Sequence, residues 1–329
     1  MSSKTAEEES IMNLMPKKSI MVLNDLQWLE IMECPQLRNI IINTTVSLPS
    51  LKKLSIMNSN AMVMEAFSRN LTSLTCLALD TIQDLVFLPK NVLRDNMHLK
   101  HLYIANCTLL QCDGIFFTEN NNELPLLSCL ELVVQLCHAL NSLNFPLPCW
   151  SSLREVHIET CRGLKSFPEG LSLLPHLQTL RIGQFCEDLD NFPFPDSDQL
   201  QIQISGHHQH YFTSLKYLVL LGWPKLKSLP SQLQHLKKLK GLGIKEFSGL
   251  ITLPEWLGSL VSLNELLIFN CENLMYLTSK EAMLRLTLLE EFEIKNCPLL
   301  KDRCNKDRGG REWSKISHIQ TIKIDDVPV

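Results

Sequence analysis

The sequence lacks the basic surplus that nucleic-acid-binding proteins carry. Its 329 residues include 31 Lys and Arg against 35 Asp and Glu, which gives a formal net charge of −4. Proteins bind DNA and RNA largely through contacts between basic side chains and phosphates. We therefore expect no nucleic-acid partner for this chain.

Long apolar segments are also missing. No apolar run approaches the roughly 20 residues that a membrane-spanning helix needs. The first ten residues, MSSKTAEEES, are polar and acidic where a secretory signal would be basic and then apolar. These absences argue against a membrane span and against secretion.

Motifs of the large enzyme classes do not occur either. The sequence contains no GxxxxGK followed by Ser or Thr, no GxGxxG after a strand, no HExxH and no GxSxG. Such motifs position phosphates, zinc ions and serine nucleophiles in the folds that use them. We therefore predict that the chain is not an enzyme and that it holds no cofactor or metal of its own.

Two groups of residues could bind a metal, but each has a simpler explanation. The run HHQH at residues 207–210 lies among polar residues and is typical of a solvated loop. Glu155, His157 and Glu159 alternate along one predicted strand, so they share a face and could hold a metal or act as an acid–base pair. A solvated surface is the favoured interpretation of both groups.

A motif of the form LxxLxLxxC recurs along the chain. Clear copies start at Leu26, Leu99, Leu153, Leu263 and Leu289. Weaker copies, with other apolar residues at some positions, start at Leu51, Leu74, Leu127, Leu177, Leu215, Leu239 and Ile319. Most starts lie about 23 to 30 residues apart, the spacing of leucine-rich repeats. One wider gap includes QLQIQI at residues 199–204, a candidate for a thirteenth, irregular strand.

The repeat predicts one short strand per copy. Apolar and polar residues alternate through its centre, so the strand buries one face and exposes the other. A single strand cannot bury that face alone, but stacked copies form a parallel sheet over a continuous core. We therefore predict an α/β leucine-rich-repeat solenoid, or horseshoe. It has about 12 short strands on its concave face, and irregular loops and short helices on its convex side.

Several of the 12 cysteines are explained by the repeat. Its ninth position points inward where the strand ends, and Cys34, Cys107, Cys161, Cys271 and Cys297 occupy it, with Phe185, Trp223 and Phe247 in other copies. A free cysteine behaves there as a small buried hydrophobe, which suits a reducing compartment. Cys107 and Cys112 are therefore not expected to bind zinc, since no second ligand pair follows at zinc spacing.

The second half of each repeat returns the chain over the convex side. Segments such as GLKSFPEGL at residues 163–171 combine a leucine pair with a proline turn. One repeat carries a helix signal instead, because Thr278 and Glu281 form a capping-box pattern before an apolar run.

The C-terminal residues predict a final repeat and a cap. CPLLKDRC continues the repeat that starts at Leu289, and the last strand follows from Ile319. The terminal repeat of a solenoid exposes its core unless polar or bulky side chains cover it, and charged residues between 301 and 308 together with Trp313 can supply that cover. The expected organisation is a polar, disordered N-terminus at residues 1–19, leucine-rich repeats at 20–296, and the last repeat and cap at 297–329.

This C-terminus has the form CPxLxxRC followed by GxxWxKIxHIxxIxI. It resembles the end of plant nucleotide-binding leucine-rich-repeat (NLR) disease resistance proteins of the coiled-coil class. The matching residues are Cys297, Pro298, Leu300, Arg303, Cys304, Gly310, Trp313, Lys315, Ile316, His318, Ile319, Ile322 and Ile324. With repeats of the form LxxLxIxxCxxLxxLP, the resemblance covers roughly residues 21–329.

The resemblance implies a domain of an intracellular immune receptor. In that family the leucine-rich repeats bind proteins, take part in sensing pathogen effectors, and hold a nucleotide-binding domain inactive. The expected partners are a pathogen effector or guarded host protein, and the nucleotide-binding and coiled-coil domains of a full-length receptor. The expected location is the cytoplasm, with the nucleus as an alternative. ADP or ATP would bind only in a nucleotide-binding domain, whose P-loop this chain lacks.

Other functions stay open at this point. One is a stand-alone, truncated leucine-rich-repeat protein that acts as a decoy, a regulator or an adaptor of a ubiquitin ligase. The adaptor would need an F-box-like helical segment before the repeats, and residues 1–20 are too short for one. An extracellular receptor domain would need a signal peptide and LxGxIP repeats, which do not occur here.

Residues between the strand leucines would face the concave surface and bind a protein partner. The candidates are Tyr103, Glu155, His157, Glu159, Arg181, Tyr217, Val219, Leu221, Lys245, Leu267, Phe269, Glu291 and Glu293. In the repeat that starts at Leu127, the facing residues would be Cys129, Glu131 and Val133.

Two groups stand out among these candidates. The first is an apolar patch, formed by Tyr217, Val219, Leu221, Leu267 and Phe269. Such patches mark interfaces, unless the irregular segment 185–214 shields this one. The second group is acidic, formed by Glu155, Glu159, Glu291 and Glu293, and it could pair with a basic partner surface. Ordinary solubility is the favoured explanation of the acidic group.

Overall fold

The computed structural model describes residues 19–34, 44–68, 71–111, 126–195 and 211–329. Three features predicted above lie outside these ranges: the polar N-terminus before Ser19, the histidine run at 207–210 and the candidate strand at 199–204. The outer boundaries of the predicted organisation therefore stay predictions.

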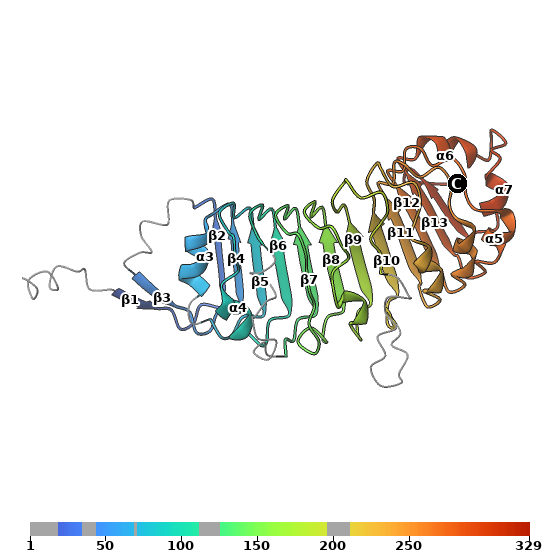
Figure 1. The fold of residues 1–329 in the computed structure, drawn as a ribbon. Coiled ribbons are helices and arrows are strands. Elements are labelled where there is room, and N and C mark those ends of the chain that lie inside the picture. Colours follow the sequence, from blue (N-terminus) through green and yellow to red (C-terminus); the bar gives the residue numbers. More distant parts are fainter. Residues whose placement is uncertain (1–18, 35–43, 69–70, 112–125, 196–210) are drawn as a thin grey trace, which may run out of the picture.

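One long sheet organises the chain, and Figure 1 shows its strands side by side in sequence order. Its parallel strands are β2 (Trp28–Met32), β4 (Lys53–Met57), β5 (Cys76–Asp80), β6 (His101–Ala105), β7 (Glu131–Gln135), β8 (Glu155–Glu159), β9 (Thr179–Gly183), β10 (Tyr217–Leu221), β11 (Gly241–Lys245), β12 (Glu265–Phe269), β13 (Glu291–Lys295) and β14 (Thr321–Ile324). The predicted leucine-rich-repeat solenoid is confirmed, since each recognised copy of the motif contributes one of these strands.

Two strands lie outside this sheet. β1 (Ser19–Val22) pairs with β3 (Thr44–Ser47) in a separate parallel sheet. The long sheet itself therefore begins at β2, although apolar residues start earlier in the sequence.

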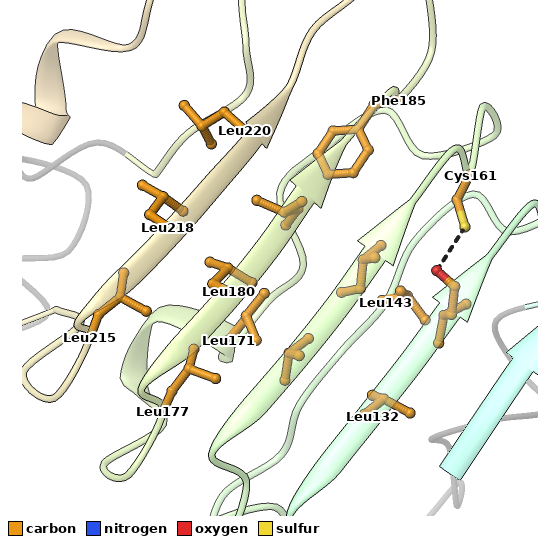
Figure 2. Close-up of a cluster of buried hydrophobic side chains, with 14 of the residues drawn as sticks. Leu132, Leu143, Cys161, Leu171, Leu177, Leu180, Phe185, Leu215, Leu218 and Leu220 are labelled. Atoms are coloured by element: carbon orange, nitrogen blue, oxygen red, sulfur yellow. Dashed lines mark hydrogen bonds between the residues drawn. The ribbon is translucent and has the colours of Figure 1, made fainter. Parts of the chain in front are cut away.

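Leucines and isoleucines from the strands form a continuous core. In β6, for example, Leu102 and Ile104 are fully buried while their neighbours are partly exposed. Figure 2 shows how inward leucines of β7, β9 and β10 line up, and how Leu171 approaches them from the segment between two strands. Fully burying one such side chain stabilises the fold by about 1.5–3 kcal/mol. Because each face is buried by the neighbouring repeats, the repeats stabilise one another.

The predicted inward cysteines are buried, apart from a half-buried Cys34. Cys161 donates its S–H to the carbonyl oxygen of Val134 on the preceding strand, with a sulfur–oxygen distance of 3.7 Å (Figure 2). Burial raises the pKa of the Cys107 thiol to about 12. This thiol is therefore protonated at neutral pH and unreactive as a nucleophile.

A left-handed residue follows nearly every strand of the long sheet. These residues are Glu33, Asn58, Thr81, Asn106, Leu136, Thr160, Gln184, Glu246, Asn270, Asn296 and Asp325, with φ between 47° and 62°. The N–H of each one from Glu33 to Asn270 donates to the last residue of the next strand, as Asn106 does to Gln135 at 3.0 Å. This conformation turns the chain inward, so that the following ninth residue enters the core. Asparagine adopts it more readily than most residues.

The register of β7 differs from the one predicted. Leu102 pairs with Leu132 and Ile104 with Val134, so the outward residues are Glu131, Val133 and Gln135. Cys129, predicted to face outward, is buried. The motif here starts at Cys129 rather than at Leu127, and its ninth residue is Cys137, which is also buried. A cysteine in place of the first leucine caused the error.

Short helices occupy many of the connections between strands. They are α3 (Ala61–Ser68), α4 (Lys90–Arg94), η2 (Leu171–Leu173), η3 (Ser231–His235), η4 (Glu255–Ser259), α5 (Lys280–Leu284), α6 (Pro298–Arg303) and α7 (Trp313–Ile316). Each forms part of a return segment, and η2, η3 and η4 each bury a leucine in the core.

The predicted capping box is displaced by one residue. The N-cap of α5 is Ser279, whose side chain accepts a hydrogen bond from the N–H of Ala282 at 3.2 Å. Glu255 from the preceding repeat, rather than Glu281, then binds the N–H and the hydroxyl of Ser279. The cap therefore joins two repeats, which a local sequence motif does not reveal.

A last short strand and the segment around Trp313 follow the C-terminal α6, while the predicted cap stays a prediction. β15 (Val327–Pro328) pairs antiparallel with β14. Trp313 packs against the core, and the buried Glu312 accepts hydrogen bonds from the N–H of Leu277 at 2.9 Å and from Lys315 at 2.7 Å.

We expect Gly183→Ala to destabilise the chain strongly. A Cβ at this position would lie 1.9 Å from the carbonyl oxygen of Leu221, a backbone atom of the paired strand that cannot move aside. We expect a loss of at least about 3 kcal/mol in the free energy of unfolding, measured by urea titration. Gly309→Ala is the control, because Gly309 also has positive φ but no atom within 4 Å of the added Cβ. It should cost about 1 kcal/mol. Equal losses for the two variants would contradict the account of this strand contact.

Candidate functional site on the concave surface

Outward side chains of the long sheet form three rows across the strands, because neighbouring strands pair without offset. From β6 to β14 the first row is His101, Glu131, Glu155, Thr179, Tyr217, Gly241, Glu265, Glu291 and Thr321. The middle row is Tyr103, Val133, His157, Arg181, Val219, Gly243, Leu267, Glu293 and Lys323. The third row, from β6 to β13, is Ala105, Gln135, Glu159, Gly183, Leu221, Lys245, Phe269 and Lys295. All 13 candidates predicted from the sequence lie in these rows.

Hydrogen bonds join the polar side chains on β6 and β7. The Tyr103 hydroxyl donates to Oε2 of Glu131 at 2.5 Å, and Nδ1 of His101 lies 2.9 Å from the same oxygen. Burial raises the pKa of Tyr103, and its bond to Glu131 adds to this effect. Burial would raise the pKa of Glu131 as well, but the bonds from Tyr103 and His101 outweigh it and lower that pKa.

The polar side chains on β8 and β9 are also paired. Nε2 of His157 lies 2.9 Å from Oε1 of Glu155, and Nε of Arg181 donates to Oε1 of Glu159 at 2.6 Å. The predicted acidic group is thus divided, because Glu291 and Glu293 lie on β13, several strands away. Three of its four carboxylates have a basic or imidazole partner within the chain.

An apolar surface follows on β10 to β12. We call Tyr217, Val219, Leu267 and Phe269 the apolar platform. Tyr217 is 44% exposed, and the other three are partly exposed. β11, the strand between β10 and β12, has glycines at two of its outward positions. A Cβ added to Gly241 would lie 2.7 Å from Cδ1 of Tyr217, and a Cβ added to Gly243 would lie 3.0 Å from Cγ2 of Val219. The side chains of β10 therefore lie over β11.

Leu221 does not belong to this exposed surface, although the sequence placed it there. It is only 6% exposed. Gln184, which follows β9, donates a hydrogen bond to Glu246, which follows β11. These two residues follow the strands on either side of β10, which ends at Leu221. Leu221 thus contributes to packing rather than to a contact surface.

Charged side chains flank the platform. Nζ of Lys245 lies 5.1 Å from the ring centroid of Phe269. Burial lowers the pKa of this lysine, and the nearby positive charge of Arg181 lowers it further by a smaller amount. Burial and the carboxylates of Glu291 and Glu293 raise the pKa of Glu265. Within the described residues, neither Lys245 nor Glu265 has an ion-pair partner.

Sequence reasoning missed several residues of this surface. Glu131 was assigned to a strand in the wrong register, so its role as a shared acceptor was not predicted. Lys323, which donates to Oε1 of Glu291 at 2.5 Å, lies in a recognised repeat, IQTIKI, and the alternation there could have identified it. Gly241 and Gly243 also occupy outward positions of β11. Two glycines at alternate positions of a predicted strand were the sequence signal that could have identified them.

Among the described residues, no three His, Cys, Asp or Glu side chains are grouped so that they could hold a metal ion. Within the same part of the chain, no helix is both long and apolar enough to cross a bilayer.

In sequence, the chain is 27% identical to TMV resistance protein N from Nicotiana glutinosa over 164 residues. The match covers 46% of this chain but only 14% of that protein. It confirms the predicted resemblance to the leucine-rich-repeat domains of plant NLR resistance proteins, while the coiled-coil class stays a prediction. No protein-family model matches the chain.

Solved leucine-rich-repeat structures are also similar. An internalin from Listeria monocytogenes has 15% identity and a TM-score of 0.47, with coverage of 92% of this chain and 74% of that one. The leucine-rich-repeat domain of the type III effector XopL has 22% identity and a TM-score of 0.38, with coverage of 56% and 66%. The fold assignment itself rests on the strand register described above.

We expect Glu131→Gln to lower stability in a pH-dependent way. The folded pKa of Glu131 is lowered, so its charge stabilises the fold above the unfolded pKa of about 4.3, and this contribution disappears as pH falls through the lower folded value. Because the site is partly exposed, we expect a loss of no more than about 1 kcal/mol at pH 7 and almost none at pH 3. Urea titrations at both pH values measure the difference. The exposed Glu272→Gln is the control, and a pH-independent loss would contradict this assignment.

Proposed function

We propose that the chain is the protein-binding domain of an intracellular plant immune receptor, acting in the cytoplasm, with the nucleus as an alternative. The concave surface on β10 to β12 would recognise a pathogen effector or a guarded host protein. One observation carries the proposal: an apolar platform lies at least partly exposed beside strands whose carboxylates are bonded to partners within the chain. Exposed apolar side chains that cluster in this way favour a protein interface. The similarity to a plant resistance protein supports the biological setting.

The same receptor would use this domain to hold its nucleotide-binding domain inactive. Acidic side chains of β12 and β13 lie next to the platform. Glu265 and Glu293, which form no ion pair within the described residues, offer a surface for a basic partner, whereas Glu291 is bonded to Lys323. ADP or ATP would bind in that separate domain, together with the switch that drives the defence response. The role of this chain is then recognition and restraint rather than catalysis.

We expect the double change Tyr217→Glu and Phe269→Glu to abolish partner binding and to leave the thermal midpoint nearly unchanged. Both side chains are at least partly exposed, so two charges there disrupt an apolar interface more than they disrupt the core. The measurement is affinity capture from infected host tissue on the immobilised chain, followed by mass spectrometry.

A matched control introduces the same charges elsewhere. Ser166 and Ser228 are exposed residues of return segments, outside the sheet, and changing both to Glu should leave capture intact. If the platform variant retained the same proteins as the control, the proposed interface would be wrong.

Long-read sequencing of the 5′ end of the transcript tests the receptor setting separately. A continuous reading frame that encodes GxxxxGK followed by Ser or Thr upstream would support the NLR assignment. A frame that starts at Met1 would favour the alternative of a stand-alone decoy, regulator or ubiquitin-ligase adaptor.

A further inference from the structure

Two charged side chains of opposite sign border the apolar platform without forming an ion pair within the described residues. Lys245 lies in the third row on β11, and Glu265 lies in the first row on β12. Neither forms an ion pair within the described residues. Arg181, in contrast, is bonded to Glu159, and Lys323 to Glu291. Lys245 and Glu265 differ in this respect from these paired neighbours on the sheet.

The spacing of these two charges is that of an extended peptide. They lie four residues apart along the strand direction and on adjacent strands. With about 3.3 Å per residue and about 4.8 Å between strands, their Cα atoms are about 14 Å apart. Gly243 and Leu267 lie between them in the middle row, and the Val219 side chain of β10 lies over Gly243. In an extended chain, side chains at positions i, i+2 and i+4 share one face and span about 13 Å.

We propose that the platform binds an extended protein segment that carries an acidic, an apolar and a basic residue at alternate positions. This inference rests on the proposed function and names the chemistry of its partner. The acidic residue pairs with Lys245, the apolar residue covers Val219 and Leu267, and the basic residue pairs with Glu265. Gly241 and Gly243 let the Tyr217 and Val219 side chains lie across β11, so the apolar surface between the two charges is continuous.

Charge complementarity favours this occupant over a purely apolar one. Lys245 and Glu265 are both partly buried, and an apolar segment would desolvate them further without supplying any compensating charge. A segment with one charge of each sign satisfies both groups and excludes segments of a single sign, because like charges repel. Such a surface would select its partner by sequence as well as by shape.

The test is a selection from a phage-displayed library of random dodecapeptides on the immobilised full chain. The peptides that are enriched should share the pattern acidic–x–apolar–x–basic, in one or the other chain direction. Their dissociation constants, measured by fluorescence anisotropy, should rise about tenfold for Lys245→Met and about tenfold for Glu265→Gln, the cost of one lost charge pair. Lys227→Met and Glu272→Gln, exposed residues outside the sheet, are the matched controls and should leave binding unchanged.

The outcomes separate this inference from the function on which it rests. Enriched peptides without the pattern, or with affinities that neither Lys245→Met nor Glu265→Gln changes, would overturn the inference. If those peptides still fail to bind the Tyr217→Glu and Phe269→Glu variant, the platform remains a protein-binding surface. A selection that enriches no peptide also counts against the inference, and the capture experiment then decides the proposed function independently.

Discussion

The turn at the end of each strand is the constraint on which the rest of the structure depends. A left-handed residue such as Asn106 donates its N–H to the next strand and directs the following side chain into the core. Because this turn recurs in almost every repeat, neighbouring strands stay in register. Constant register places the leucines on one face of the sheet and the variable residues on the other. The concave rows are therefore a consequence of the turn.

The concave surface divides into two parts with different physical character. On β6 to β9 carboxylates meet cations or imidazoles, as Glu159 meets Arg181. Such groups contribute little binding free energy when they exchange their partners within the chain for groups of another protein. On β10 to β12, glycines on the central strand let Tyr217 and Val219 lie across the sheet, and Lys245 lacks a carboxylate partner among the described residues. We propose this second part as the binding surface because apolar surface and charge without an ion-pair partner remain there.

Most of the fold could be predicted from the sequence, because the leucine spacing by itself determines which residues face inward. The errors arose where residues from different repeats decide the outcome. Cys129 replaces a leucine and shifted one predicted strand, and Glu255 caps a helix of the next repeat through Ser279. Leu221 follows the pattern of an exposed residue but is only 6% exposed, between strands that Gln184 and Glu246 join. The repeat pattern does not contain such contacts between repeats.

Amide hydrogen exchange of the free chain, followed by mass spectrometry, tests the central claim that the concave surface is a preformed, rigid sheet. The account predicts slow exchange throughout β10, β11 and β12, equal to that of β8 and β9, because their strand amides are hydrogen-bonded to neighbouring strands. The return segments between strands should exchange faster. Exchange in β10 to β12 as fast as in those segments would contradict the account, since the platform would then lack a fixed surface.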